Sequence, residues 1–224
     1  MATLPARSAL DIDLQAIVEL QDNPGVDTLG RRSVAFVHPR HSHIAVNTCF
    51  DTFPQGAFVS ETKGRLVGYL NAIRLPSRVA LAPHNWTAIT TSGTGAAHNP
   101  SGKWLYVCRM LLTAGAGHQS LDPELSPLLV SLKNLAMKAG LEGVAIALPF
   151  PGKRERSGTT EFQRQTLAEG AKDFGRPYLS GSMGPSTSIN IALYAGFDHE
   201  IALPNYTGIA EHFALMVWRN PEFD

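Results

Sequence analysis

Trp104-Leu-Tyr-Val-Cys-Arg-Met-Leu-Leu-Thr113 and, further along the chain, Val144-Ala-Ile-Ala-Leu148 are short and almost wholly apolar. Such runs are typical of strands that are buried on both faces of a sheet. Between them, apolar residues recur at helical spacing from Leu125 to Ala139, behind the start Asp122-Pro-Glu and ahead of Gly140. Aspartate and proline favour the first turn of a helix, and glycine favours the position after its last turn. This strand–helix–strand order predicts a parallel crossover.

The chain before this crossover adds helices and a hairpin. Residues 9–20 carry apolar side chains at helical spacing, and a second helical piece is expected to end near Phe50. Residues 53–76 contain two alternating apolar runs around the turn Thr62-Lys-Gly, which predicts a β-hairpin. Residues 77–103 are rich in Ser, Thr, Gly, Asn and Pro, and we expect them to form a long surface excursion.

The chain after the crossover ends in a helix and two strands. Ile191-Ala-Leu-Tyr194-Ala-Gly196-Phe197 predicts a short helix that stops at its glycine. Glu200-Ile-Ala-Leu-Pro-Asn-Tyr206 then alternates as a strand does, and residues 213–218 predict a final strand. Tyr194 falls in the last helical turn, where its phenol can project past the helix end into a cleft.

Composition bounds the class of protein. The 224 residues suffice for one sizeable core, and 19 basic side chains balance 19 acidic ones. No net field favours nucleic acid or an anionic membrane, so we expect neither as a partner. Residues 1–8 lack the apolar region of a signal peptide, and no run approaches the roughly 20 apolar residues of a membrane span. These features favour a cytoplasmic location, and they leave a homodimer open.

Metal or thiol chemistry is not indicated. His38, His41 and His43 lie close together in sequence, but no carboxylates or thiols accompany them, so we interpret them as solvated or capping residues and expect no metal. Cys49 and Cys108 are far apart in sequence, and two reduced, buried thiols are the expectation.

Two of these segments resemble motifs of the Gcn5-related N-acetyltransferase (GNAT) superfamily. Residues 191–197 are similar to its "A..LYe..GF" motif, and the hairpin in residues 53–76 is similar to its "fVae.dG.lvGy" strands. The resemblance covers residues 53–219, with 1–52 as an N-terminal helical part, and implies a single GNAT-like domain over 1–224. The implied fold is α/β: a mixed, mostly antiparallel central sheet with a parallel crossover and flanking helices.

The resemblance implies an acyl-CoA-dependent acyltransferase, with acetyl-CoA as co-substrate and an amine of an unidentified small molecule or protein as acceptor. Tyr194 would act as general acid to the departing thiolate, and a backbone N–H of the 104–113 strand would stabilise the oxyanion. No general base is assigned: Glu61, His98 and Arg109 are the polar candidates in the substrate cleft, and a water relay is an equal alternative. The residues expected to bind the cofactor are Leu111, Leu112, Thr113, Gly115, Gly117, Ser120, Thr187 and Asn190.

One motif departs from the family. The usual pyrophosphate signature, Arg/Gln-x-x-Gly-x-Gly/Ala, falls on residues 120–125, where Pro123 and Leu125 replace the glycines. Asp122 and Glu124 would repel a diphosphate and cap the helix without a ligand, although the earlier Gly-x-Gly could supply amides instead. A second hypothesis is therefore a GNAT-fold binding or regulatory module with a degenerate CoA site and no transferase activity.

A more distant similarity links the chain to the GNAT-like loading domains of polyketide synthases. The shared pattern includes the stretch Pro204-Asn-Tyr206. In those domains, a histidine in the helix before the glycine and an arginine after Asn-Tyr take part in decarboxylation. Ala192 and Thr207 occupy these positions, and neither can polarise a carboxylate. The sequence therefore favours ordinary acyl transfer over decarboxylation.

Overall fold

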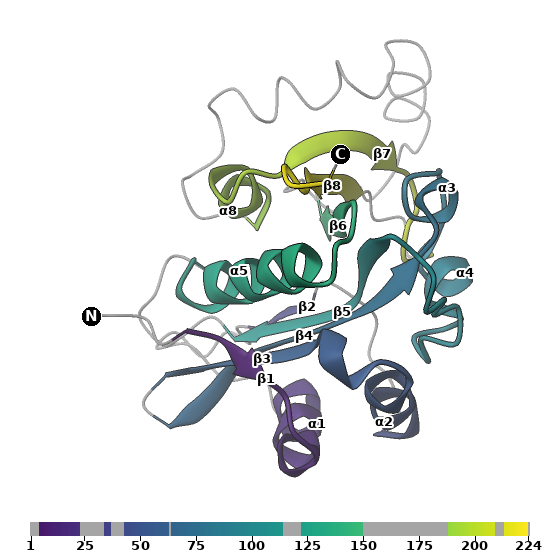
Figure 1. The fold of residues 1–224 in the computed structure, drawn as a ribbon. Helices are drawn as coiled ribbons and strands as arrows, with labels where there is room; N and C mark the ends of the chain where they lie inside the picture. The colour runs from purple at the N-terminus through teal and green to yellow at the C-terminus, as the bar shows by residue number, and fades with distance from the viewer. Residues whose placement is uncertain are drawn as a thin grey trace, which may run out of the picture.

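A mixed sheet of eight strands forms the centre of the molecule (Figure 1). The structure is a computed structural model, and it describes residues 5–22, 34–36, 43–62, 64–113, 122–149, 188–208 and 213–223. Seven strands follow the order β1-β3-β4-β5-β6-β8-β7, and β2 pairs with β5. The strands are β1 (Arg7–Ser8), β2 (Val34–Phe36), β3 (Ala57–Thr62), β4 (Arg65–Leu75), β5 (Trp104–Thr113), β6 (Gly143–Pro149), β7 (Asp198–Leu203) and β8 (Phe213–Arg219).

Helices cover both faces of this sheet. α5 and α8 lie on one face, and α1 and α2 lie on the other (Figure 1). The helices are η1 (Asp11–Asp13), α1 (Leu14–Asp22), α2 (His43–Thr52), η2 (Pro54–Gly56), α3 (Ser77–Ala80), α4 (Trp86–Thr90), α5 (Asp122–Lys138) and α8 (Ser188–Tyr194). Among the described segments, no helix is long and apolar enough to cross a membrane.

The strand directions confirm the predicted crossover. β5 and β6 pair in parallel, and α5 connects them. The other pairings, β1–β3, β2–β5, β3–β4, β4–β5, β6–β8 and β7–β8, are antiparallel. The sheet is thus mixed and mostly antiparallel, as the sequence predicted, and the hairpin β3–β4 turns at Gly64.

Glycines end α5, the helix of the crossover, and α8. Gly140 follows α5 with a φ of +59°, and Gly196 follows α8 with a φ of +82°. In each case the next amide reaches back to the last helical turn: Leu141 N–H donates to the Ala136 carbonyl, and Phe197 N–H donates to that of Ala192, both at 2.9 Å. Only glycine adopts this left-handed conformation without strain, which explains why both predicted helix ends are confirmed.

The predicted surface excursion over residues 77–103 is wrong in part. The segment contains α3 and α4, and Trp86 of α4 is only 3% exposed. A Cβ on Gly93 would lie 2.7 Å from the Trp86 ring, and Gly93 has a φ of +81°. The small and polar residues therefore serve close packing and tight turns, as well as contact with solvent.

The last strand pair also differs slightly from expectation. β7 begins two residues before Glu200 and ends at Leu203, so Tyr206 is not part of the strand. Tyr206 follows Asn205, whose φ is +53°, and its side chain turns into the core. The apolar ring of Tyr206 fits the alternating pattern of a strand, but in the structure a turn, and not a strand, places that ring in the core.

Candidate active site

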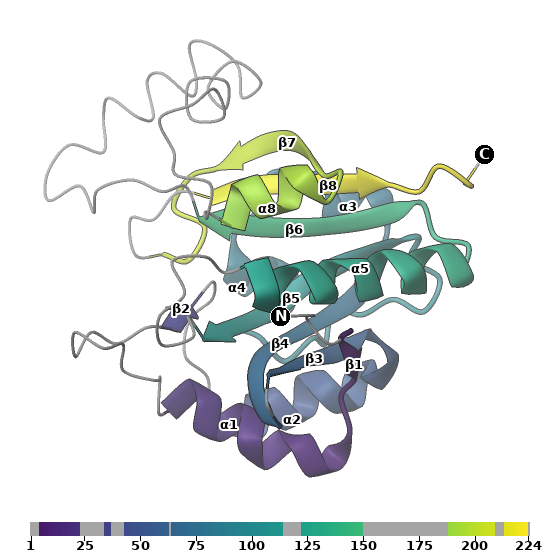
Figure 2. The same ribbon diagram turned by 90° about the vertical axis from the view of Figure 1, so that its left-hand side faces the viewer.

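The sheet forks between β5 and β6. These strands pair only at Trp104–Gly143, Leu105–Val144 and Tyr106–Ala145. Beyond these pairs the described parts of the two strands share no rung of the ladder, and Figure 2 shows them separating toward their carboxyl ends. β2 pairs with β5 at residues 111–113, so the gap between β5 and β6 opens at residues 107–109 of β5. Backbone N–H and C=O groups on unpaired strand edges need water or a ligand as partners.

A β-bulge lies next to this fork. Asn71 of β4 pairs with Arg109 of β5, whereas Ala72 pairs with Val107, so Cys108 is the extra residue of β5. A bulge takes its residue out of the ladder and redirects the neighbouring side chains. The Cys108 carbonyl is held by the indole N–H of Trp86 at 3.0 Å, which fixes the bulge to α4. Backbone groups are therefore presented where the two strands begin to part.

Three buried polar side chains accompany the bulge on its α2 side. Arg109 is 1% exposed, and Tyr69 and Asn71 of β4 are fully buried. Asn71 Oδ1 lies 3.1 Å from the Sγ of Cys49 in α2 and 3.3 Å from that of Cys108, which places these side chains on one face. Burial raises the pKa of the Tyr69 phenol, which therefore stays protonated at neutral pH.

The two thiols are free and lie 3.1 Å apart. The hydrogen bond with Cys108 and the positive charge of Arg109 lower the pKa of Cys49, against the effect of burial. Burial raises the pKa of Cys108. The expectation of two reduced, buried cysteines is confirmed, and their closeness was not predicted because it depends on α2 packing against the bulge.

A second set of polar groups forms a hydrogen-bonded chain beside the fork. His84 Nδ1 lies 2.6 Å from the Ala82 carbonyl, His84 Nε2 lies 2.7 Å from Tyr106 Oη, and Tyr106 Oη lies 2.7 Å from Tyr206 Oη. A carbonyl only accepts, so Nδ1 carries the proton; burial lowers the pKa of His84, so Nε2 is free to accept. Tyr106 then donates to His84, and Tyr206 donates to Tyr106. Burial also raises the pKa of both phenols.

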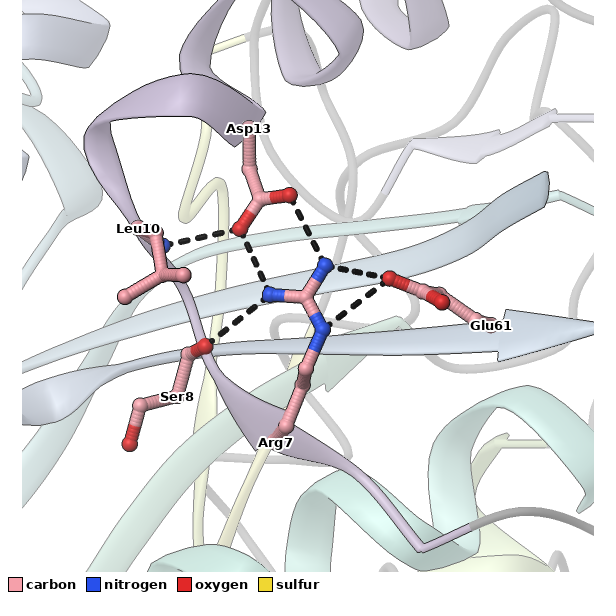
Figure 3. Close-up of polar contacts among 5 residues, drawn as sticks. All are labelled: Arg7, Ser8, Leu10, Asp13 and Glu61. Atoms are coloured by element: carbon pink, nitrogen blue, oxygen red, sulfur yellow. Dashed lines mark hydrogen bonds and ion pairs between the residues drawn. The ribbon is translucent and has the colours of Figure 1, made fainter. Parts of the chain in front are cut away.

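The predicted substrate residues are distributed over distant places. Arg109 belongs to the bulge, but Glu61 of β3 accepts a hydrogen bond of 3.0 Å from Arg7 Nε (Figure 3). Glu61 pairs with Leu66, five residues along β4 from Asn71, or about 17 Å at strand spacing. His98 accepts the Arg74 backbone N–H at 3.1 Å and stacks on Phe53, so its ring holds a loop against β4.

Tyr194 lies at the end of α8 and is 84% exposed. Ala192 of the same helix is buried in the core. The general-acid role of Tyr194 stays a prediction. Of the predicted cofactor residues, Leu111, Leu112 and Thr113 are in β5 and Asn190 is in α8. Gly115, Gly117, Ser120 and Thr187 lie outside the described residues, as do His38 and His41.

Comparison with known proteins identifies the architecture. No family model matches the chain. A curated relative, the "Probable hydrolase YhcX" of Bacillus subtilis (strain 168), is 22% identical over 223 residues, which cover 97% of this chain and 39% of the relative. The chain thus spans about two fifths of that relative's length.

Three solved structures share the fold. The GphF GNAT-like decarboxylase in complex with isobutyryl-CoA has a TM-score of 0.63 and 18% identity, covering 97% of this chain and all of GphF. The loading GNATL domain of CurA from Lyngbya majuscula has a TM-score of 0.62 and 16% identity, covering 96% of each chain. The aminoglycoside 6'-N-acetyltransferase of Enterococcus faecium has a TM-score of 0.55 and 10% identity, covering 99% of this chain and 100% of the enzyme. The chain therefore has the GNAT fold that its motifs predicted.

Proposed function

We propose that the chain is an acyl-CoA-dependent acyltransferase that acts at the bulge of β5. The observation that carries this proposal is the ladder between β5 and β6, which ends at Tyr106, two residues before the bulge at Cys108. The same fold occurs in GphF in complex with isobutyryl-CoA. Acetyl-CoA is the proposed donor, and an amine is the proposed acceptor.

The fork fits the pantetheine arm of coenzyme A. That arm is extended and carries two amide groups, so it can take the place of a missing strand between β5 and β6. Residues 107–109 of β5 would offer backbone groups along this edge, and Leu111, Leu112 and Thr113, which pair with β2, would line the path of the arm beyond it. The pyrophosphate and the rest of the arm are assigned, as proposals, to Gly115, Gly117, Ser120, Thr187 and Asn190.

Acyl transfer then requires an acceptor amine, a backbone N–H and a phenol near the bulge. The acceptor nitrogen forms a bond to the thioester carbon, a backbone N–H of β5 receives the developing oxyanion, and the carbon–sulfur bond breaks. The attacking nitrogen loses its extra proton to water at the tetrahedral intermediate, and the thiolate takes a proton from a phenol, which water then reprotonates. Tyr194 is the proposed donor; Tyr106 and Tyr206, which lie beside the fork, are the phenols with which it is compared.

Ligand binding tests the proposal directly. Titration with acetyl-CoA, followed by calorimetry and by thermal unfolding, should show saturable binding well below millimolar concentration and a rise in Tm. Adenosine 3',5'-bisphosphate, which lacks the pantetheine arm, is the control and should bind more weakly. The absence of both binding and a Tm shift would contradict the proposal and favour the binding or regulatory module.

The general acid is tested by removing one hydroxyl at a time. If Tyr194 protonates the thiolate, Tyr194→Phe should lower kcat by about 10- to 1,000-fold with little change in the KM for acetyl-CoA. Thiol release over a panel of amines is the measurement, and Tyr206→Phe is the matched variant. Unchanged turnover in Tyr194→Phe, with a loss in Tyr206→Phe, would move the role to the buried phenols.

A further inference from the structure

The bulge carries buried hydrogen-bond donors that lack acceptors. Tyr69 Oη, Asn71 Nδ2, and Arg109 Nε and Nη1 are buried and have no hydrogen-bond partner within the described parts of the chain. The three side chains, here called the donor cluster, come from neighbouring rungs of β4 and β5. Native proteins rarely leave even one such group unsatisfied, so three together indicate a site made for an acceptor.

The charge of the cluster is also unbalanced. A guanidinium is a cation, and among the described residues that of Arg109 makes one hydrogen bond, from Nη2 to the Gly93 carbonyl at 3.3 Å. Among the described residues, the partly buried acidic side chains are engaged elsewhere: Asp13 and Glu61 bind Arg7, Glu142 binds Ser77 and Trp104, and Glu200 binds Arg219. The charge of Arg109 acts on the Cys49 thiol, whose pKa it helps to lower, but no carboxylate among the described residues pairs with it. A buried guanidinium without a carboxylate partner is unfavourable, and it gains from an anion that arrives with a ligand.

The donors fit a carboxylate. Gly93 takes one hydrogen of Nη2, and whichever hydrogen it takes, two parallel N–H groups of the guanidinium remain for a planar acceptor. Asn71 Oδ1 faces the two thiols, which turns its NH₂ group away from them and toward the Tyr69 phenol; that phenol is protonated and keeps its own O–H to donate. One positive charge with two neutral donors matches a monoanion better than a phosphate dianion.

We propose that Arg109, Asn71 and Tyr69 form a carboxylate-binding site, and that the molecule transformed at the bulge carries a carboxylate. Only the second half of this inference rests on the proposed acyl transfer. Arg109 is itself a bulge residue, so a carboxylate at its guanidinium lies within one side-chain length of the proposed reacting carbonyl. The carboxylate belongs either to the acyl group or to the acceptor amine.

Small carboxylates test the site without any assumption about catalysis. Sodium acetate should raise the Tm of the wild-type protein more than sodium chloride of equal ionic strength does, and acetamide should have no such effect. Arg109→Met should remove the acetate response. Because it replaces an unpaired buried charge by an unbranched apolar side chain, this variant should be at least as stable as the wild type. Arg78→Met, on the exposed surface of α3, is the charge-matched control and should keep the response.

A second variant places a carboxylate of the protein itself next to Arg109. Asn71→Asp is nearly isosteric and stands on the rung opposite Arg109, so its charge should replace the ligand, raise the Tm and abolish the acetate response. The inference is overturned if acetate acts no more strongly than chloride, if it acts equally on Arg109→Met, or if Arg109→Met lowers the Tm. That last result would show that Arg109 is a structural residue.

Paired ligands then assign the source of the carboxylate. Succinyl-CoA and butyryl-CoA differ by a terminal carboxylate, and tighter binding of succinyl-CoA that Arg109→Met removes would place it on the acyl chain. If the two bind equally, the acceptor carries it, and turnover of α-amino acids should exceed that of their amides. Failure of every acyl-CoA to bind would refute the proposed function, while an Arg109-dependent acetate response would still establish the site.

Discussion

His84 links the stability of the protein to pH. Its ring is desolvated, which lowers its pKa below the ordinary value of about 6.5. An unfolded chain therefore takes up a proton at His84 as the pH falls below that value, whereas the folded chain does not. Stability that is present above pH 6.5 should be lost as the pH falls toward the folded pKa, by at most about 1.4 kcal/mol for each pH unit.

Urea unfolding of the wild type and of His84→Gln between about pH 7.5 and 5 measures this effect. Glutamine offers an acceptor to Tyr106 without titrating, so the variant should lose less stability on acidification than the wild type does. Burial also lowers the pKa of His98 and His199, so a residual slope is expected. Identical slopes in the two proteins would show that His84 is not buried as a neutral ring.

Single residues of the site were only partly predictable. Arg109 is one of the three polar residues that the sequence placed in the substrate cleft, and it lies at the bulge, whereas Glu61 and His98 lie elsewhere. Tyr69 and Asn71 fit the alternating pattern of the hairpin, and nothing else in the sequence marks them as residues of a functional site. Tyr106 and Tyr206 are one hundred residues apart, so their hydrogen bond arises only when the turn after β7 meets β5. The spacing of apolar residues predicts local secondary structure, but it does not predict contacts between residues that are far apart in the sequence.

At the scale of elements, Arg7 connects β1 to its neighbours. Its guanidinium binds Asp13 of η1 through two hydrogen bonds of 2.7 and 2.9 Å and also reaches Glu61 of β3 (Figure 3). Asp13 Oδ2 in turn accepts the Leu10 N–H at 2.8 Å. β1 is only two residues long, so these bonds are a large part of what holds it at the sheet edge.

Arg7→Gln should lower the free energy of unfolding by about 1–2 kcal/mol at neutral pH, because it removes charged hydrogen bonds that are partly exposed to solvent. The hydrogen bond with Arg7 lowers the pKa of Asp13 below its ordinary value of 3.8. The wild-type advantage should thus persist above pH 3.8 and shrink as acid protonates Asp13. Urea unfolding at about pH 7 and pH 2.5 measures both numbers, and an advantage that is independent of pH would contradict the role of Asp13.

Close approach of backbones governs another element, the start of β6. A Cβ on Gly143 would lie 2.3 Å from the Trp218 carbonyl of β8 and 2.9 Å from the Trp104 ring. Gly143→Ala should therefore destabilise the protein by about 2–4 kcal/mol, because backbone cannot move aside as a flexible side chain can. Gly64→Ala is the control: its φ of +72° is strained, but its Cβ would meet nothing, so a loss near 1 kcal/mol is expected. Equal losses in thermal or urea unfolding would refute the steric explanation.

On the scale of the whole molecule, the sequence predicted the layers better than the order of the strands. The crossover, the hairpin and the helix ends follow from local patterns, and each is confirmed. The positions of β1 at one edge and of β7 outside β8 depend on packing between distant segments. The fork could not be predicted, because both strands have continuous apolar runs and only the register shows that their pairing ends after three rungs.

That register divides the sheet into two halves. β1, β2, β3, β4 and β5 form one half and β6, β8 and β7 the other, and their only shared ladder among the described strands is the three rungs between β5 and β6. Residues 107–109 of β5 and 146–149 of β6 share no rung with each other, whereas residues 111–113 of β5 are paired with β2. If the pantetheine arm enters the fork, acetyl-CoA should slow hydrogen exchange in residues 107–109 and 146–149 while leaving β3 unchanged. Adenosine 3',5'-bisphosphate should protect neither strand, because it lacks the arm. Binding of acetyl-CoA without protection of these two segments would place the ligand elsewhere on the sheet, since an arm paired with both edges must close their amides to water.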